Sequence, residues 1–437
     1  MNKISKYKLD ADIGNQESVI YAFQNLIIFL ASAIVMPIVV GQTLGLDQLQ
    51  IAQMLQRTFF LCGIVTFVQV RWGHGLPIQD GPAGLWSGIY ISVATLTASS
   101  GGSLETLRAN LEMALMISGC LVMLLVCTNL LQVISRFFTG TINGIVIILM
   151  TLQISASIMK GFIGYKFENS VEKQKAFFVA VVTLVTIFGL LRFAKGFLKS
   201  IATFVGMAVG WILAACLGIS GSKLDAGNRI FGLPEVFAWG KPEFDVGIVI
   251  TCVIGATVLL SMSFASIEGI GNAVYGKTEP EQIKRGIFFH GAAEILTGIF
   301  PTIGFMPYVS SIGIVEMTGV AAKKPFYLVA AGMVLMGLMP GVGAFFASIP
   351  EPVGNGALLV IFALCLTQGI KQIVQSGFDK RSEYVTGVSL MIGAGVMFLP
   401  SDTFDGLPTL ATCLLSNGLI VGVAAALVLD RILSGMK

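Results

Sequence analysis

The stretch Leu76-Pro77-Ile78-Gln79-Asp80-Gly81-Pro82-Ala83-Gly84 interrupts an apolar segment of the chain with two prolines and two glycines. A later segment is interrupted in the same way by Phe300-Pro301-Thr302-Ile303-Gly304-Phe305-Met306-Pro307-Tyr308-Val309-Ser310-Ser311-Ile312-Gly313. Proline lacks an N–H and clashes with the preceding helical turn, and glycine adopts conformations that other residues avoid, so both segments are predicted to break. Each falls third in a run of seven apolar segments. Interrupted spans at corresponding places of two halves indicate a transporter binding site near the bilayer midplane.

The composition indicates that lipid surrounds this chain. Of its 437 residues, 55% are hydrophobic and 12% are charged, whereas soluble globular proteins carry about 25% charged residues. In lipid every backbone polar group needs an internal partner, and continuous apolar runs of about 20 residues predict helices rather than the alternating strands of a barrel. The net charge of +3 is not gathered in one patch, so we expect no nucleic-acid partner.

The apolar segments predict an all-α polytopic membrane protein with fourteen transmembrane spans. The longest polar interruption, Ser220 to Asp245, divides them into two sets of seven. An odd number per half reverses the second half in the membrane, which predicts two inverted repeats. The expected spans are 19–42, 52–70, 76–98, 110–134, 138–159, 175–192, 199–219, 247–274, 284–299, 301–319, 326–348, 352–374, 383–400 and 408–430.

Loop charges predict the orientation. With the N-terminus inside, lysine and arginine are more frequent in the cytoplasmic loops than in the outer loops, so both termini are expected in the cytoplasm. We therefore expect a multi-pass protein of the cytoplasmic membrane. The seven cysteines lie in apolar stretches without a CxxC motif, which indicates neither a disulfide framework nor a metal site.

Several strings resemble the nucleobase–ascorbate transporter family, also called nucleobase:cation symporter family 2, which contains xanthine and uracil permeases. The first span, from Gln24-Asn25 to the string Pro37-Ile38-Val39-Val40-Gly41, is similar to the family's first span, and Leu76-Pro77 with Gly81 is similar to its third. The string Ile267-Glu268-Gly269-Ile270-Gly271-Asn272 resembles the acidic motif of its eighth span. Segments 313–319 and 350–356 resemble spans ten and twelve, so the resemblance covers nearly the whole chain.

The resemblance implies two domains. Spans 1–4 and 8–11 (19–134 and 247–348) would form a core domain, and spans 5–7 and 12–14 (138–219 and 352–430) a gate domain. It further implies that discontinuous spans three and ten carry short antiparallel strands followed by half-helices, and that substrate lies between these strands and span eight. Family members move nucleobases with protons or ascorbate with sodium, and the family suggests a homodimer formed through the gate domain.

Glu268 is the strongest single candidate for the site. A carboxylate near the middle of a membrane costs about 2.5–3.5 kcal/mol on insertion scales, so it is expected to face protein or water and to have a function. It can accept hydrogen bonds from the ring N–H groups of a planar base. It can also carry the coupled proton, because desolvation disfavours its charged form. The alternative is a structural acceptor that caps a neighbouring helix.

The other candidates flank the two breaks or lie near Glu268. They depart from the family's pattern where Ser310-Ser311 replace Gln-Asn or Glu-Asn, where Asn25 replaces His and where Asn272 replaces His or Asp. They are expected to offer hydroxyls, backbone N–H groups, a stacking ring and an amide, and the alternative for each is packing. The substrate-binding candidates besides Glu268 are Ser310, Ser311, Ala83, Gly84, Trp86 and Asn272, with Gln24, Asn25 and Glu316 as secondary candidates.

The remaining polar groups give no sign of an enzyme active site. His290 and Glu294 form an i, i+4 pair that is expected to satisfy itself near the membrane edge, and Arg57 is expected to snorkel or to neutralise an acidic neighbour. No grouping of ligands indicates a metal or cofactor, and no nucleophile–base motif is visible.

The sequence therefore predicts a proton-coupled symporter that imports a purine or related nucleobase, such as xanthine, urate or uracil. The coupling ion is expected to be H⁺. The alternative is an anion exchanger of the sulfate or bicarbonate kind on the same inverted-repeat fold. Basic residues near the breaks would favour that alternative, whereas this chain places acid there.

Overall fold

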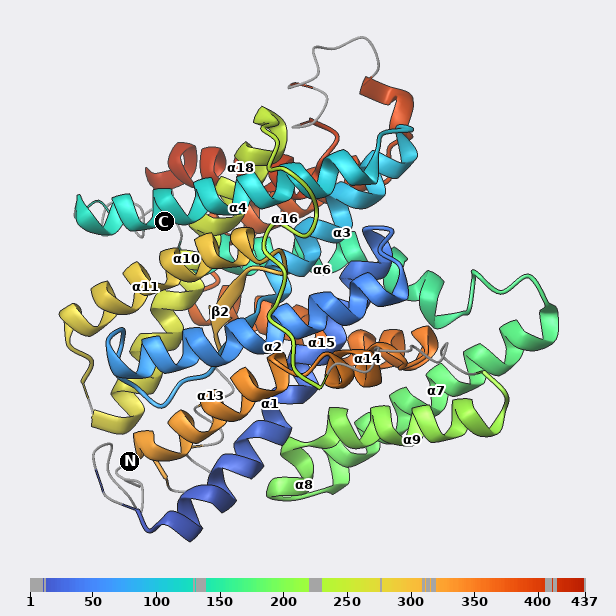
Figure 1. Cartoon of the computed structure of the whole chain (residues 1–437). Helices are drawn as coiled ribbons and strands as arrows, with labels where there is room; N and C mark the ends of the chain where they lie inside the picture. Colours follow the sequence, from blue (N-terminus) through green and yellow to red (C-terminus); the bar gives the residue numbers. More distant parts are fainter. Residues whose placement is uncertain are drawn as a thin grey trace.

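The computed structural model describes residues 11, 13–128, 130, 139–219, 230–275, 277–308, 311, 315, 320–404, 411 and 415–435. Within these residues the protein is a helical bundle around one pair of short strands (Figure 1). Seven of the described helices are long and apolar enough to cross a membrane, and a bent pair raises the number to eight. The shorter helices belong mainly to the interrupted or late segments.

Most described helices overlap predicted spans, whereas the spans 110–134, 301–319 and 408–430 lie partly outside the described residues. The first half contains α1 (Asn15–Thr43), α2 (Gln48–Arg71), β1 (Asp80–Pro82), α3 (Gly84–Ser99), α4 (Leu104–Cys127), α6 (Gly140–Phe162), α7 (Ser170–Phe193), α8 (Phe197–Ser200) and α9 (Ala202–Cys216). The second half contains α10 (Val246–Tyr275), α11 (Pro280–Ile299), β2 (Phe305–Pro307), α13 (Lys323–Gly337), α14 (Pro340–Ala347), α15 (Glu351–Gln375), α16 (Lys380–Met397), the 3₁₀ turn η1 (Ser401–Phe404), α18 (Gly418–Ile432) and the 3₁₀ turn η2 (Leu433–Gly435).

One expected span differs from the structure. The segment 326–348 was expected as a continuous helix, but α13 and α14 meet at an angle of 84°. Pro340 is the first residue of α14. Because proline has no N–H and its ring blocks the preceding turn, α13 cannot continue through it.

Both predicted breaks are present, and they meet. β1 and β2 pair antiparallel, with Asp80 opposite Pro307 and Gly81 opposite Met306. All residues of both strands are buried. We call this strand pair the ribbon. It joins two segments that lie more than two hundred residues apart in the chain.

Side chains from neighbouring helices satisfy the carbonyl groups freed by the second break. Nε of Arg57 donates a hydrogen bond to the carbonyl of Pro301 at 2.8 Å, and the hydroxyl of Tyr90 donates to the carbonyl of Thr302 at 3.1 Å. An unpaired backbone group at membrane depth costs several kcal/mol, so these bonds stabilise the break. Arg57 is 1% exposed, so the expectation that it snorkels is wrong.

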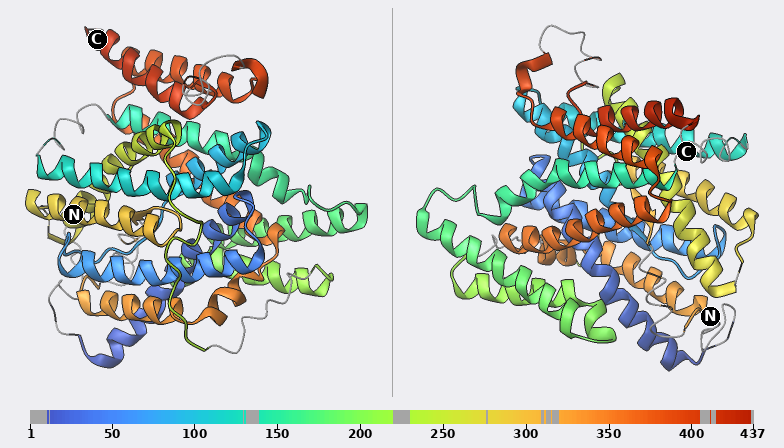
Figure 2. Two further views of the ribbon diagram at one scale, coloured as in Figure 1. Left: turned by 45° about the horizontal axis from the view of Figure 1, so that its top comes forward. Right: turned by 180° about the vertical axis from the view of Figure 1, so that it is seen from behind.

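The helices pack in two groups. In the first, which we call the ribbon bundle, α4 packs on α10 and α11, and α13 packs on α1 and α2, with the ribbon and α3 among them. In the second bundle, α15 packs on α6 and α7, α7 packs on α9, and α16 packs on α18. Figure 1 shows α7, α8 and α9 together at one edge, and Figure 2 shows the red C-terminal helices at another. The two bundles meet where α3 contacts α6 and where α1 contacts α15.

Close helix crossings rely on glycine. A Cβ on Gly119 of α4 would lie 2.5 Å from the carbonyl oxygen of Gly291 in α11, and one on Gly144 of α6 would lie 2.6 Å from that of Gly369 in α15. No larger residue fits at these four positions without moving a backbone. Small residues let membrane helices approach closely, so each bundle has a tight central pair.

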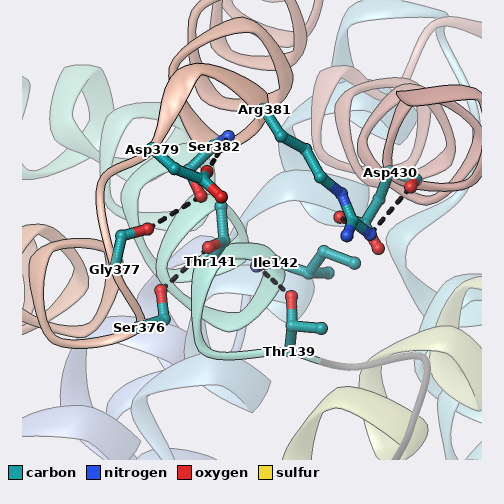
Figure 3. Close-up of polar contacts among 9 residues, drawn as sticks. All are labelled: Thr139, Thr141, Ile142, Ser376, Gly377, Asp379, Arg381, Ser382 and Asp430. Carbon is teal, nitrogen blue, oxygen red and sulfur yellow. Dashed lines mark hydrogen bonds and ion pairs between the residues drawn. The ribbon is translucent and has the colours of Figure 1, made fainter. Parts of the chain in front are cut away.

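Polar contacts fasten the second bundle at one end (Figure 3). The hydroxyls of Thr141 and Ser376 lie 2.8 Å apart and join the start of α6 to the end of α15. The guanidinium of Arg381 lies 2.8 Å from the carboxylate of Asp430 and joins α16 to α18. These contacts connect four helices of one bundle and none of the other.

Candidate functional site

We call the boundary between the two bundles, where α3 contacts α6 and α1 contacts α15, the seam. The part of the seam next to the end of β1 is the candidate site. Gly84 begins α3 directly after the strand and is half-buried. A Cβ added to Gly84 would meet Met36 of α1 at 3.8 Å and Phe362 of α15 at 3.9 Å. Gly84 therefore lies where α1 of the ribbon bundle and α15 of the second bundle come close together.

The start of α3 offers backbone N–H groups as hydrogen-bond donors at the seam. The first N–H groups of a helix have no acceptor within it, and Ala83 precedes α3 without a side-chain cap. The positive end of the helix dipole lies there too and favours carbonyl or anionic oxygens. One predicted donor is unavailable, because the N–H of Ala83 donates to the carbonyl of Gly304 at 2.9 Å. Gly84 lies at the seam, whereas the N–H of Ala83 is bonded to the segment that leads into β2.

Two other candidates lie beside the first break. Ser311 is buried, and its hydroxyl accepts a hydrogen bond from the N–H of Gln79 at 3.2 Å, so it ties the two breaks together. Asn25 is 3% exposed, and its Oδ1 has no hydrogen-bond partner. The side-chain amide of Gln79 donates to the carbonyl of Asn25 at 3.4 Å, which places Asn25 next to β1. Asn25 thus holds an unused acceptor near the ribbon, while Gln24 is half-buried in α1.

Two predicted residues lie outside the described part of the chain. They are Ser310 and Glu316. Their roles stay predictions.

Trp86 belongs to the interior of the ribbon bundle. It is 0% exposed, and its indole Nε1–H donates to Oε1 of Glu294 at 2.7 Å. In this structure Trp86 is therefore a packing residue inside the ribbon bundle rather than a ring available for stacking on a ligand. Nε2 of His290 lies 3.8 Å from the same Oε1 atom. His290 and Glu294 are both buried and lie close together as expected, but the pair is not self-contained, because Glu294 also accepts the bond from Trp86.

Glu268 lies on an exposed stripe of α10. Ala265, Glu268 and Asn272 are exposed at helical spacing, while Ile267 and Ile270 between them are buried. Such small and polar side chains are typical of a helix face turned to protein or to a wet cavity rather than to lipid tails. Since α10 also packs on β2 and α3, the stripe belongs to a helix that borders the ribbon.

Asn272 has a structural partner. Its Oδ1 accepts a hydrogen bond from the hydroxyl of Thr278 at 3.0 Å, and the same hydroxyl lies 2.9 Å from the backbone carbonyl of Glu268. Thr278 stands just before α11. Asn272 therefore fastens the turn between α10 and α11 in this structure.

Sequence reasoning missed two residues of the first break and its surroundings. Asp80 lies inside β1, is 1% exposed, and has no hydrogen-bond partner at either carboxyl oxygen. The hydroxyl of Tyr308 donates to the carbonyl of Pro82 at 3.1 Å, and its ring packs on Phe29. Asp80 had a visible signal, because it is a charged residue within an apolar span. Tyr308 had none, since its partner lies in the other half of the chain.

A second feature of the seam is a cavity of about 380 Å³ further along α3. It is bordered by α3, α6, the end of α16 and the start of α18, and its polar lining includes Ser92, Gln153, Lys160 and Asn417. The side-chain amide of Gln153 donates to the hydroxyl of Ser92 and, at 3.4 Å, to Oδ1 of Asn417. Gln153 of the second bundle is thus bonded to α3 of the ribbon bundle.

The described residues contain no group of three His, Cys, Asp or Glu side chains placed to hold a metal ion. Several polar groups around the ribbon are bonded to one another or to backbone, whereas the carboxyl oxygens of Asp80 and Oδ1 of Asn25 have no hydrogen-bond partner. The arrangement is suited to hydrogen bonding and proton binding.

Comparison with known proteins identifies related sequences over the whole chain. The sequence model of a family described as a permease family matches residues 16–402. A putative purine permease, YwdJ, of Bacillus subtilis is 30% identical over 94% of this chain and 95% of its own length. The xanthine permease of the same organism is 28% identical over 93% and 91%, and its uric acid permease PucK is 26% identical over 93% of each chain.

Solved structures with the same fold are transporters of another sequence group. The transmembrane domain of a cyanobacterial bicarbonate transporter, BicA, aligns over 96% of this chain and all of that chain with a TM-score of 0.58 at 15% identity. The structure of SLC26A9 aligns over 97% of this chain and 67% of that chain with a TM-score of 0.63 at 13% identity. At these identities the likeness concerns the fold alone.

Proposed function

The chain belongs to the family of xanthine and uracil permeases that this sequence model describes, and from that premise we propose that it is a proton-coupled symporter importing a purine or related nucleobase across the cytoplasmic membrane. The relatives named as purine, xanthine and uric acid permeases support this substrate class. The observation that carries the proposal is the ribbon, which joins both broken spans beside an uncapped helix start at the seam. Discontinuous spans that meet in this way are typical of substrate sites in transporters, which supports the proposal.

Helix packing supports fourteen spans in two inverted repeats. If α1, α2 and α4 correspond to α10, α11 and α13, the contact of α4 with α11 corresponds to that of α13 with α2. The contact of α4 with α10 then corresponds to that of α13 with α1. The ribbon and the α6–α15 pair each join one element of the first half to its equivalent in the second half. We assign the ribbon bundle to the core domain and the second bundle to the gate domain, with both termini cytoplasmic and a homodimer formed through the gate domain.

Substrate would bind in the seam between these domains. The uncapped N–H groups at Gly84 would donate to the carbonyl oxygens of an oxopurine, and Oδ1 of Asn25 would accept from a ring N–H. Glu268, on the exposed stripe of α10, would accept a further ring N–H and carry the proton. Movement of the ribbon bundle against the second bundle would then expose the seam to each side in turn.

The anion-exchanger alternative receives less support. The bicarbonate transporter shares the fold at 15% identity, whereas the purine permease relative is 30% identical along the whole chain. The side chains that border Gly84 are apolar, and the ionisable group on the exposed stripe of α10 is a carboxylate. An anion would find no positive side chain among these residues.

Uptake into membrane vesicles tests the function directly. Radiolabelled xanthine, hypoxanthine, guanine, urate and uracil are supplied with and without an inward proton gradient, with sulfate and bicarbonate as comparison substrates. At least one base is expected to accumulate, and only with the gradient. The proposal would be overturned if only the anions accumulated, or if base uptake were the same with and without the proton gradient.

The substitution Glu268→Gln tests the coupling role. The amide keeps the shape but holds no exchangeable carboxyl proton, so gradient-driven accumulation is expected to fall to the level without a gradient. Exchange of internal for external base should persist, because it needs no net proton movement. Glu281→Gln, at an exposed position in the first turn of α11, is the matched control and should behave as wild type. Wild-type accumulation by Glu268→Gln would remove Glu268 from its proposed role.

A further inference from the structure

We propose that Asp80 is a second proton-carrying group of the transporter, which binds its proton within the ribbon and releases it when the ribbon moves. This inference rests on the proposed function, because it concerns the ion that drives transport. It assigns a role to a residue of β1, whereas Glu268 lies in α10.

The burial of Asp80 is the first argument. Its side chain is 1% exposed, and neither Oδ1 nor Oδ2 has a hydrogen-bond partner. An ionised carboxylate without hydrogen bonds, removed from water, is among the costliest groups a protein can bury. Its backbone is held firmly, since its N–H donates to Oγ1 of Thr66 at 3.1 Å. The fold thus fixes the position of Asp80 while leaving its carboxyl oxygens unused, so a bound proton is the means of neutralising it.

The neighbouring histidine supplies the second argument. Nδ1 of His74 accepts a hydrogen bond from the N–H of Leu76 at 3.0 Å, so the ring proton of His74 resides on Nε2. An imidazolium could not accept that bond, so His74 is neutral here. Its Nε2 lies 3.8 Å from Oδ2 of Asp80, beyond hydrogen-bond distance. His74 therefore does not supply a positive charge to balance an ionised Asp80 in this state.

No lysine or arginine in the described part of the chain is an electrostatic partner of the Asp80 carboxyl. Within the described residues, the further titratable groups that face it are the thiol of Cys62 on α2 and the phenol of Tyr308 after β2. Both are neutral at physiological pH when buried. The surroundings are thus consistent with one proton on the Asp80 carboxyl.

The same geometry provides for release. A short approach of His74 to Asp80 would turn the 3.8 Å separation into an N–H···O bond to the ionised carboxylate, which stabilises the charged form. In the step itself, water on one side of the membrane delivers a proton and one O–H bond forms on the carboxylate. On the other side that bond breaks, the electron pair stays on oxygen, and the proton passes to water. No redox change occurs.

The variant Asp80→Asn tests the assignment in vesicles. The amide copies a neutral carboxyl in size, so base exchange in the absence of a gradient should be retained while gradient-driven accumulation is lost. His74→Leu should shift the pH dependence of accumulation, because leucine has no N–H and the ionised form of Asp80 loses its donor. The matched control is Asp47→Asn, since Asp47 caps α2 at an exposed position and asparagine also caps helices well. Wild-type accumulation by Asp80→Asn would overturn the proposal.

Infrared spectroscopy of the unmodified protein gives an independent reading. A protonated carboxyl absorbs separately from an ionised one, and ¹³C-labelled aspartate shifts that band. Among the described residues Asp80 is the buried aspartate. We expect a protonated aspartate band that changes when base is added, and absence of any such band would contradict the proposal even if Asp80→Asn does not fold. Failure of wild type to accumulate base would instead contradict the proposed function, so the two failures are distinct.

Discussion

At the scale of single residues, the bond between Trp86 and Glu294 holds the two breaks in register. Trp86 lies in α3 after the first break, and Glu294 lies in α11 before the second. A Cβ on Gly304 would come within 2.5 Å of both side chains, so only glycine lets the approach to β2 pass over them. Thus one indole, one carboxyl group and one glycine fix the spacing of the ribbon against two helices.

The substitution Trp86→Phe should therefore destabilise the protein. It leaves Oε1 of Glu294 buried without its 2.7 Å donor, and an unsatisfied buried group costs about 1–3 kcal/mol. Thermal unfolding in detergent is the measurement, with the exposed Trp72→Phe as the matched control, which should change little. Adding Glu294→Leu to Trp86→Phe should recover part of the loss, because apolar groups then replace both partners. Equal stability of the two tryptophan variants would show that the bond contributes nothing.

Sequence alone predicted the breaks because their cause is local. Pro77, Pro82, Pro301 and Pro307 interrupt helices wherever they stand. The partners of those breaks were not predictable, because Arg57 and Trp86 bond to residues more than two hundred positions away. Asp80 was quoted in the break yet not assigned a role, since burial depends on tertiary packing. Local sequence patterns thus predict where the helices break, and only the fold shows which polar atoms lack hydrogen-bond partners there.

At the scale of elements, the paired helices depend on how closely their backbones approach. Gly291→Ala would add a Cβ 2.8 Å from the carbonyl oxygen of Gly119, and overpacking of this kind costs about 1–3 kcal/mol. Gly189→Ala in α7 is the matched control, because no atom lies within 4 Å of the added Cβ. There the higher helix propensity of alanine should instead stabilise by about 0.5–1 kcal/mol. Thermal unfolding should show opposite signs, and equal signs would refute the crossing argument.

At the scale of the whole molecule, the proposed function requires the two bundles to move against each other. Ser92 of α3 and Gln153 of α6 are bonded across the seam, whereas Thr141 and Ser376 are bonded within the second bundle (Figure 3). Crosslinks at these two places therefore have different consequences. One joins parts that must separate, and the other joins parts that move together.

The double variant Ser92→Cys with Gln153→Cys, joined by a short bis-methanethiosulfonate through two disulfide bonds, should lose base uptake, and a reducing agent should restore it by cleaving those bonds. Thr141→Cys with Ser376→Cys, treated in the same way, should retain uptake because its link lies within one moving body. Wild type, whose seven cysteines remain, receives the same reagent as a further control. If the crosslinked Ser92–Gln153 pair transports at the uncrosslinked rate, the bundles do not separate along this seam. In that case the ribbon would have to admit substrate by local opening instead.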